Sequence, residues 1–121
     1  MQKIESYKDL LVWQKSMLLV KEVYALVKLL PKEEQFALSD QMRRAVVSIP
    51  SNIAEGYGRN STNDYVRFLN IARGSIYELD TQLNVCVMLG YITEEQSKNA
   101  IELSQEVGKM INALAGKLSR H

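Results

Sequence analysis

The side chains that could bind a metal or act as nucleophiles are few in this chain. Its only histidine is the last residue, His121. A Glu-x-x-His pair of the kind that di-metal helical bundles use therefore cannot form, and no helix carries a histidine that could bind haem. The single cysteine, Cys86, has no histidine to activate it, and we interpret it as a small buried hydrophobic residue. We expect no metal, no cofactor and no enzymatic activity, unless a partner subunit supplies catalytic groups.

Two further patterns resemble chemical motifs, and both have simpler explanations. Glu33-Glu34 and Glu94-Glu95 come at expected helix starts, where the helix dipole favours negative charge. Gly56-x-Gly58 is half of a phosphate-binding loop, but it follows a predicted helix instead of a strand. Neither pattern indicates a catalytic site.

Arginine is concentrated in the middle of the sequence. Five of the six arginines lie there, namely Arg43, Arg44, Arg59, Arg67 and Arg73. Their planar side chains suit phosphate groups, and the nearby Tyr57 and Tyr65 could stack on unpaired bases. The five arginines and Tyr57 are therefore a candidate RNA- or DNA-binding surface. We expect Arg43 and Arg44 at the same height on the fold as Arg73.

The alternative is that these arginines are paired within the protein. Nearby carboxylates could neutralise them: Asp40, Glu55, Asp64, Glu78 and Asp80. In that case the tyrosines only cover one end of the fold. The sequence leaves both interpretations open.

A polar stripe accompanies the first two of these arginines. Arg44, Ser48, Asn52 and Glu55 have the spacing that places side chains along one face of a helix. Pro50 removes the hydrogen-bond donor for the carbonyl of Val46, so Ser48 or Asn52 could satisfy that group or bridge to a neighbouring helix. We expect a structural role for Ser48, Asn52 and Glu55, with contact to a ligand as the alternative.

Apolar residues at helical spacing predict the elements that position these side chains. Four helices are expected over about 8–30, 36–55, 62–89 and 94–118. The short connections between them favour antiparallel neighbours. The sequence therefore predicts one all-α domain over residues 1–121, an up-down-up-down antiparallel four-helix bundle.

Each expected helix has a distinguishing feature. The first has two apolar rows, one with Trp13, Met17, Val20 and Tyr24 and a second with Leu19, Val23, Leu26 and Leu30. Either the helix is deeply buried, or the second row faces another subunit. The second helix should be kinked at Pro50 and should stop at Gly56. The third carries a regular heptad pattern that ends at Gly90.

Composition limits the possible partners and location. The formal charge is only +1, with 15 Lys and Arg against 14 Asp and Glu. No overall field can therefore hold a polyanion or a membrane surface. The N-terminal residues are charged where a secretion signal would be apolar, and no apolar run is long enough to span a membrane. We expect a cytoplasmic protein with no membrane partner.

Three segments resemble a known protein family. They are Asp9-Leu-Leu-Val-Trp-Gln-Lys15, Gln41-Met-Arg-Arg-Ala-Val-Val-Ser-Ile-Pro-Ser-Asn-Ile-Ala-Glu-Gly56 and Tyr65-Val-Arg-Phe-Leu-Asn-Ile-Ala-Arg-Gly-Ser75. Through them nearly the whole chain is similar to the four-helix bundle proteins encoded by intervening sequences in bacterial large-subunit ribosomal RNA genes. The same superfamily includes the accessory variability determinant of diversity-generating retroelements, a homopentameric ring that binds nucleic acid and a reverse transcriptase.

The resemblance implies a ring-forming homo-oligomer, a pentamer, whose partner is RNA, DNA or another protein. The chain departs from the retroelement proteins in charge, because they are strongly basic and it is nearly neutral. Two hypotheses follow. The first is an oligomer that binds RNA or DNA weakly through the central arginines. The second is a ring-shaped scaffold for protein–protein assembly without direct nucleic-acid binding.

Overall fold

The computed structural model describes residues 3–120 and contains six helical elements. Four are long: α1 (Leu11–Val27), α2 (Leu38–Tyr57), α3 (Thr62–Met88) and α4 (Glu94–Ser119). Two are short 3-10 helices, η1 (Tyr7–Asp9) and η2 (Lys32–Glu34). No strand occurs in this described part of the chain, and the predicted all-α fold is confirmed.

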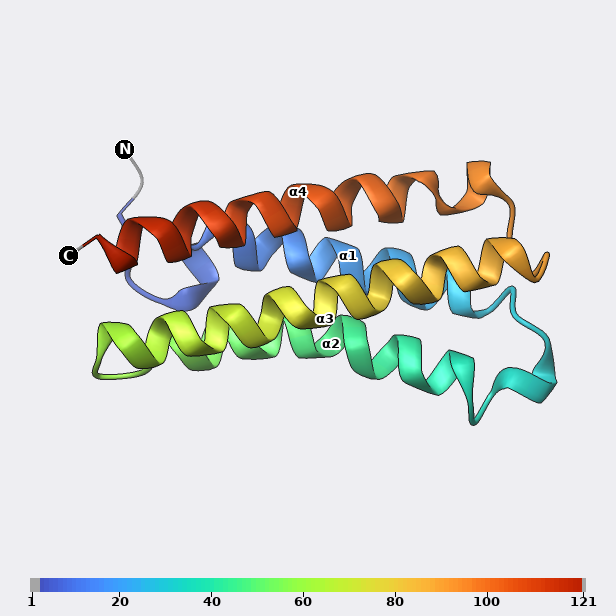
Figure 1. Cartoon of the computed structure of the whole chain (residues 1–121), viewed down its shortest axis with the longest axis horizontal. Helices are drawn as coiled ribbons and strands as arrows, with labels where there is room; N and C mark the ends of the chain where they lie inside the picture. The colour runs from blue at the N-terminus through green and yellow to red at the C-terminus, as the bar shows by residue number, and fades with distance from the viewer. Residues whose placement is uncertain (1–2, 121) are drawn as a thin grey trace.

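The long helices pack as a four-helix bundle (Figure 1). Each helix packs against the next along the chain, and α1 also packs against α4. Successive helices run in opposite directions. The α2–α3 turn at residues 58–61 therefore lies at one end of the bundle, here called the turn end. The connections at residues 28–37 and 89–93 lie at the other, the loop end.

The first helix is shorter than the expected range of 8–30. Ser6 and Asp9 do form a capping box, with the Asp9 carboxylate accepting from the Ser6 N–H at 3.1 Å. This box begins η1, however, and extended backbone at Leu10 (ψ 124°) separates η1 from α1. The capping box therefore belongs to a separate turn of helix that precedes α1.

Of the two apolar rows of α1, the second lies in the core of the bundle. The row of Leu19, Val23, Leu26 and Leu30 is buried in the core, whereas Met17 and Tyr24 of the other row are exposed. The buried face continues through Ser16, whose hydroxyl donates to the Trp13 carbonyl at 2.7 Å. A serine satisfied by its own helix can lie in the core, and it interrupts the apolar pattern on which the prediction relied.

The second helix is continuous through Pro50 and does not stop at Gly56. Gly56 is buried inside α2, and a Cβ atom placed on it would lie 2.9 Å from the Phe68 Cβ. The glycine therefore permits close packing of α2 on α3, and the helix ends one residue later at Tyr57. The expected kink at Pro50 stays a prediction.

The third helix follows its predicted heptad and ends as expected. Leu69, Ala72, Leu79 and Leu83 are all buried. Gly90 has φ +77°, and the Tyr91 N–H donates to the Cys86 carbonyl at 2.9 Å, as in a Schellman motif.

The Tyr91 side chain also joins the two connections of the loop end. Its hydroxyl donates to a carboxylate oxygen of Glu34 at 2.8 Å. This hydrogen bond raises the pKa of Tyr91 above its ordinary value, with smaller contributions from partial burial and from the negative charge of Glu34 and Glu33.

Candidate nucleic-acid interface

The described residues offer no metal site and no activated nucleophile. Among residues 3–120, no three His, Cys, Asp or Glu side chains come together as a metal would require, and His121 lies outside that range. Cys86 is buried, with its sulfur 3.5 Å from the sulfur of Met42. Burial, and secondarily the charge of Glu34, raises the pKa of the Cys86 thiol, which favours the unreactive protonated form.

Two of the predicted arginines meet at the turn end. Arg59, just after α2, and Arg67, in the second turn of α3, each place a guanidinium group 4.6 Å from the centre of the Phe68 ring. Tyr57 and Tyr65 pack edge to face beside them, with ring centres 6.2 Å apart. We call these five residues the turn cluster.

The position of the turn cluster follows from the packing of α2 on α3. Gly56 brings the end of α2 close to Tyr65 and Phe68, and Ser61 caps α3 by accepting from the Asp64 N–H at 3.1 Å. Burial, and secondarily Tyr57, raises the pKa of Tyr65. Tyr65 is therefore uncharged at physiological pH and can present a neutral aromatic face.

Both arginines of the turn cluster are paired with carboxylates, but these pairs are open to solvent. Arg59 lies 3.3 Å from Glu55, and Arg67 lies 3.3 Å from Asp64. Exposed pairs of this kind contribute only about 0–1 kcal/mol. A phosphate group could therefore replace either carboxylate at little cost.

The other three arginines lie elsewhere on the bundle. Arg44 is exposed and pairs with Asp40 at 3.0 Å, whereas Arg43 is half-buried and donates to the Gln35 carbonyl at 3.2 Å. Arg73 donates to the Asn112 side chain of α4 at 3.1 Å. Of the five predicted arginines, only Arg59 and Arg67 thus lie together, and the other three make separate contacts.

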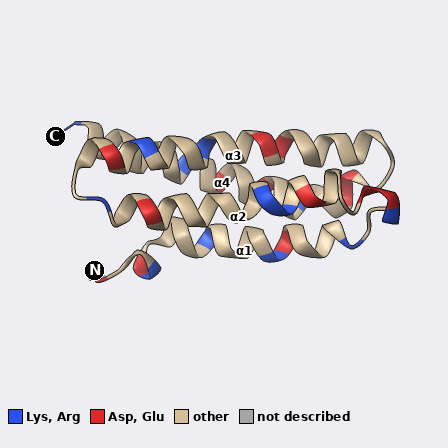
Figure 2. Ribbon diagram, turned by 90° about the horizontal axis from the view of Figure 1, so that it is seen from below, with Lys and Arg blue, Asp and Glu red and all other residues tan. Residues whose placement is uncertain are grey.

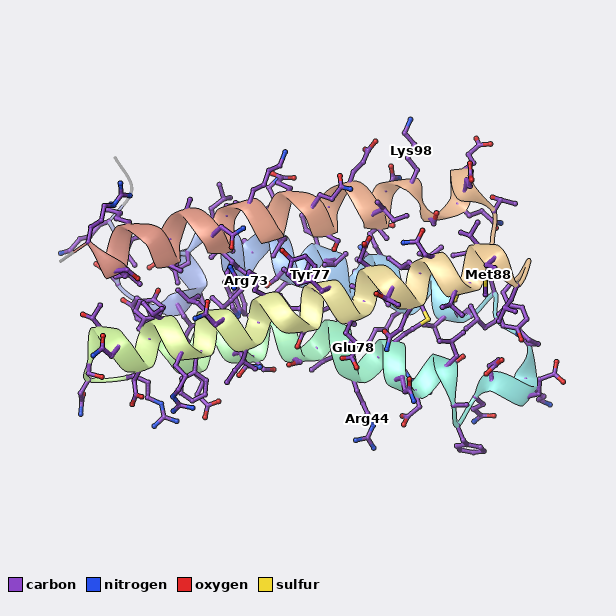
Figure 3. The ribbon with its side chains drawn as sticks, viewed as in Figure 1. Arg44, Arg73, Tyr77, Glu78, Met88 and Lys98 are labelled. Atoms are coloured by element: carbon purple, nitrogen blue, oxygen red, sulfur yellow. The ribbon has the colours of Figure 1, made fainter. Side chains whose placement is uncertain are left out.

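The expected equal height of Arg43, Arg44 and Arg73 is wrong. In Figure 3, Arg44 and Glu78 lie at the same position along the long axis of the bundle, and Arg73 lies nearer the turn end. The hydroxyl contact of Ser48 with Ser75 at 2.9 Å fixes this register. Ser48 and Ser75 are equally far from residues 61–62, whereas equal height of these arginines would need a hairpin centred near residue 58.

Charge is mixed over most of the surface and differs between the two ends. Figure 2 shows Lys and Arg interspersed with Asp and Glu along the helices, and residues 38–88 contain five of each sign. The segments that lie at the turn end in Figure 1, residues 3–9, 55–67 and 116–120, contain six Lys or Arg residues and four Asp or Glu residues. The segments at the loop end in Figure 1, residues 28–37 and 89–98, contain Glu33, Glu34, Glu94 and Glu95 against Lys28, Lys32 and Lys98.

The polar stripe on α2 lies against α3. The Asn52 amide donates to the Ser48 carbonyl at 2.8 Å and to its hydroxyl at 2.9 Å, and the Ser75 hydroxyl donates to Ser48. Ser48 thus bridges the two helices, and Glu55 instead pairs with Arg59. The Val46 carbonyl is not the acceptor in any of these contacts.

Sequence reasoning missed two residues that hold the arginines. Phe68 supports Arg59 and Arg67, and Asn112 holds Arg73 from the neighbouring helix. The spacing of Phe68 three residues after Tyr65 was an available signal. The contact between Arg73 and Asn112 joins residues 39 positions apart, so only the packing of α3 on α4 reveals it.

The fold and the turn cluster together define a small all-α bundle protein with a cationic, aromatic end. No helix within residues 3–120 is long and apolar enough to cross a membrane. The chain belongs to the 23S rRNA-intervening sequence protein family, whose sequence profile matches residues 8–113.

A solved structure supports this assignment. It is described as a protein with unknown function from the S23 ribosomal protein family of Bacteroides thetaiotaomicron. The two chains share 29% sequence identity and a TM-score of 0.81, over 87% of this chain and 98% of the other. A comparison with curated proteins found no match.

Proposed function

We propose that this protein is a non-enzymatic homo-oligomer of the bacterial cytoplasm that binds RNA through the turn cluster. The observation that carries the proposal is the meeting of Arg59 and Arg67 with three aromatic side chains at the more cationic end of the bundle. Arginine contacts phosphates, and aromatic rings stack on unpaired bases, so the cluster combines the two interactions that single-stranded RNA segments use. Membership of a family named for a 23S rRNA sequence is consistent with an RNA ligand.

The ion pairs of the two arginines and the low net charge of the chain predict weak, salt-dependent RNA binding. Each arginine must exchange a carboxylate for a phosphate, and the chain has a formal charge of only +1. Binding should therefore fall as salt rises, with a slope of about 0.7 in log–log units for each phosphate contacted in a single strand.

Fluorescence anisotropy with a labelled 23S rRNA fragment tests this proposal. Replacing Arg59 and Arg67 together by Ala should weaken binding about tenfold and reduce the salt slope. Arg44→Ala is the matched control, because Arg44 is also exposed and paired with a carboxylate but lies outside the turn cluster. The proposed site would be contradicted if the control lost as much RNA affinity as the double variant, or if the wild-type protein did not bind the RNA at low salt.

Self-association is the second part of the proposal, and α1 supports it. Four large apolar side chains of α1 are exposed, Leu11, Met17, Leu18 and Tyr24. Clusters of exposed apolar residues are typical of interfaces, and the resemblance noted above implies a pentameric ring. Leu18→Glu changes a side chain that is already 53% exposed, so it should lower the mass measured by light scattering without unfolding the bundle. A monomeric wild-type protein at micromolar concentration would contradict this part.

A protein-assembly scaffold without RNA binding is the second candidate. The exposed residues of α1 favour it equally, and so do the carboxylate partners of Arg44, Arg59 and Arg67. An oligomer that retains its mass but binds no RNA at low salt would favour this candidate over the first.

A further inference from the structure

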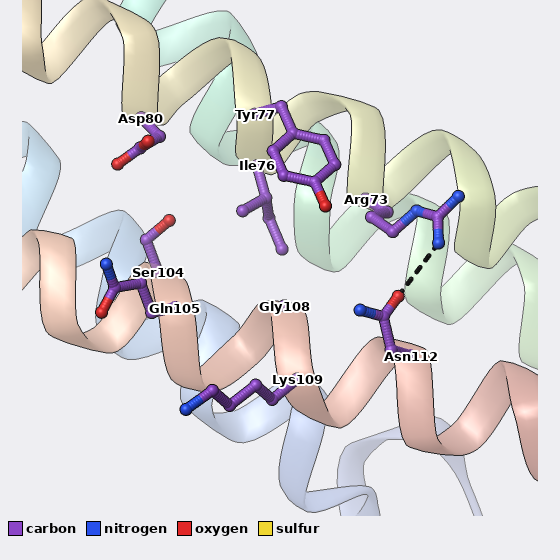
Figure 4. Close-up of a pocket in the computed structure, with 9 residues that line it drawn as sticks. All are labelled: Arg73, Ile76, Tyr77, Asp80, Ser104, Gln105, Gly108, Lys109 and Asn112. Atoms are coloured by element: carbon purple, nitrogen blue, oxygen red, sulfur yellow. Dashed lines mark hydrogen bonds between the residues drawn. The ribbon is translucent and has the colours of Figure 1, made fainter.

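A groove between α3 and α4 lies outside the turn cluster. It has a volume of about 200 Å³ and is drawn in Figure 4. Its floor is the buried Ile76, one wall is the ring of Tyr77, which is 63% exposed, and Gly108 of α4 lies opposite. The middle of the groove is therefore apolar, with one exposed aromatic face.

The two ends of the groove carry opposite charge. Figure 4 shows Arg73 and Asn112 at one end, Asp80 facing Ser104 and Gln105 at the other, and Lys109 of α4 extending toward that second end. Arg73 and Asp80 are seven residues apart on one helix, which corresponds to about 10 Å along its axis. A ligand with an anionic group for Arg73 and hydrogen-bond donors for Asp80 is complementary to these two side chains.

Arg73 is positioned to accept an anion. One of its five N–H groups donates to the Asn112 side chain at 3.1 Å. Within residues 3–120 no carboxylate forms an ion pair with it. Asn112 thus orients the guanidinium group without neutralising it, and the remaining donors can bind a phosphate group.

Gly108 keeps the groove open. A Cβ atom on this residue would lie 3.8 Å from a methyl group of Ile76, which is ordinary contact. A single added carbon therefore fits, whereas a larger side chain would occupy the space beside Tyr77. The position offers a way to fill the groove without changing its charges.

We propose that this groove binds one nucleoside monophosphate unit. Its phosphate contacts Arg73, its base lies against Tyr77, and the N–H groups of the base donate to Asp80. The unit is either a free nucleotide or one unpaired nucleotide of an RNA strand, since both present the same chemistry. This inference does not depend on the turn cluster as an RNA site.

Isothermal titration calorimetry with guanosine 5′-monophosphate tests the proposal on the full chain. Guanosine, which lacks the phosphate, should bind at least tenfold more weakly, and Arg73→Gln should produce a similar loss. Gly108→Leu should abolish binding by filling the groove. Gly116→Leu is the matched control, because Gly116 is in the same helix with nothing within 4 Å.

Several results would overturn the proposal. They are no binding of guanosine 5′-monophosphate at millimolar concentration, equal binding by the Gly108→Leu variant, and equal loss in the Gly116→Leu control. A single-stranded guanosine-containing oligonucleotide identifies the source of the nucleotide. If Gly108→Leu weakens the binding of both the oligonucleotide and the mononucleotide, the natural ligand is RNA. If it weakens the binding of the mononucleotide alone, the natural ligand is a free nucleotide. The Arg59 and Arg67 variants should leave mononucleotide binding unchanged, which separates this site from the turn cluster.

Discussion

Gly56 provides a direct test of how α2 and α3 are packed. A Cβ atom at this position would lie 2.9 Å from the Phe68 Cβ and 3.1 Å from both a ring carbon and the backbone oxygen of Tyr65. The Tyr65 oxygen belongs to the backbone and the Phe68 Cβ is bonded to it, so the clash can be relieved only if α3 moves. Overpacking of this kind costs about 1–3 kcal/mol. Replacing glycine by alanine inside a helix gains about 1 kcal/mol in propensity, so Gly56→Ala should leave stability unchanged or reduce it by up to about 2 kcal/mol.

Gly74→Ala is a matched substitution that allows the gain in helix propensity to be subtracted from the effect of Gly56→Ala. Gly74 lies inside α3, is exposed and has nothing within 4 Å, so Gly74→Ala should gain about 1 kcal/mol. Gly56→Ala should therefore be less stable than Gly74→Ala by about 1–3 kcal/mol in urea unfolding, with both variants at the same protein concentration. Equal stability of the two variants would refute the close packing assigned to Gly56.

Two further predictions concern hydrogen bonds between elements. Tyr91→Phe removes the hydroxyl that donates to Glu34. The pKa of Tyr91 in the folded protein is raised above 10.0, so this hydrogen bond stabilises the fold below about pH 10. Its contribution is lost as the pH rises through the raised pKa. The difference in unfolding free energy between wild type and Tyr91→Phe should therefore shrink at high pH in denaturant titrations, and a difference that grows with pH would contradict this sign. For the Ser48–Ser75 contact, a double-mutant cycle with alanine should give a coupling energy of about 0.5–1.5 kcal/mol, and additive losses would show that the contact contributes nothing.

The fold could be predicted largely because two helices carry strong local signals. The heptad of α3 and the Thr93–Gln96 capping box of α4 require only neighbours three or four residues apart. The sequence did not decide which face of α1 is buried, because Ser16 interrupts that face and a serine that bonds to its own helix cannot be told in sequence from an exposed one. Which face of a helix is buried depends on its neighbours, which the sequence does not identify directly.

The candidate site was predicted less well, because closeness in sequence does not place side chains together on helices. Arg43 and Arg44 are adjacent, yet successive residues point about 100° apart around a helix. One donates to the Gln35 carbonyl and the other pairs with Asp40. Arg59 and Arg67 do meet, because Gly56 brings the end of α2 against Phe68. That meeting depends on a close helix contact that sequence reasoning interpreted as a helix stop.

The Tyr91–Glu34 hydrogen bond has a consequence for exchange between copies of the chain. The α1–α2 and α3–α4 hairpins are joined covalently at the turn end and by this hydrogen bond at the loop end. Domain swapping would require one hairpin to swing away from the other and pair with a second chain. The hydrogen bond must break before that movement begins, so it favours the closed fold over a swapped one.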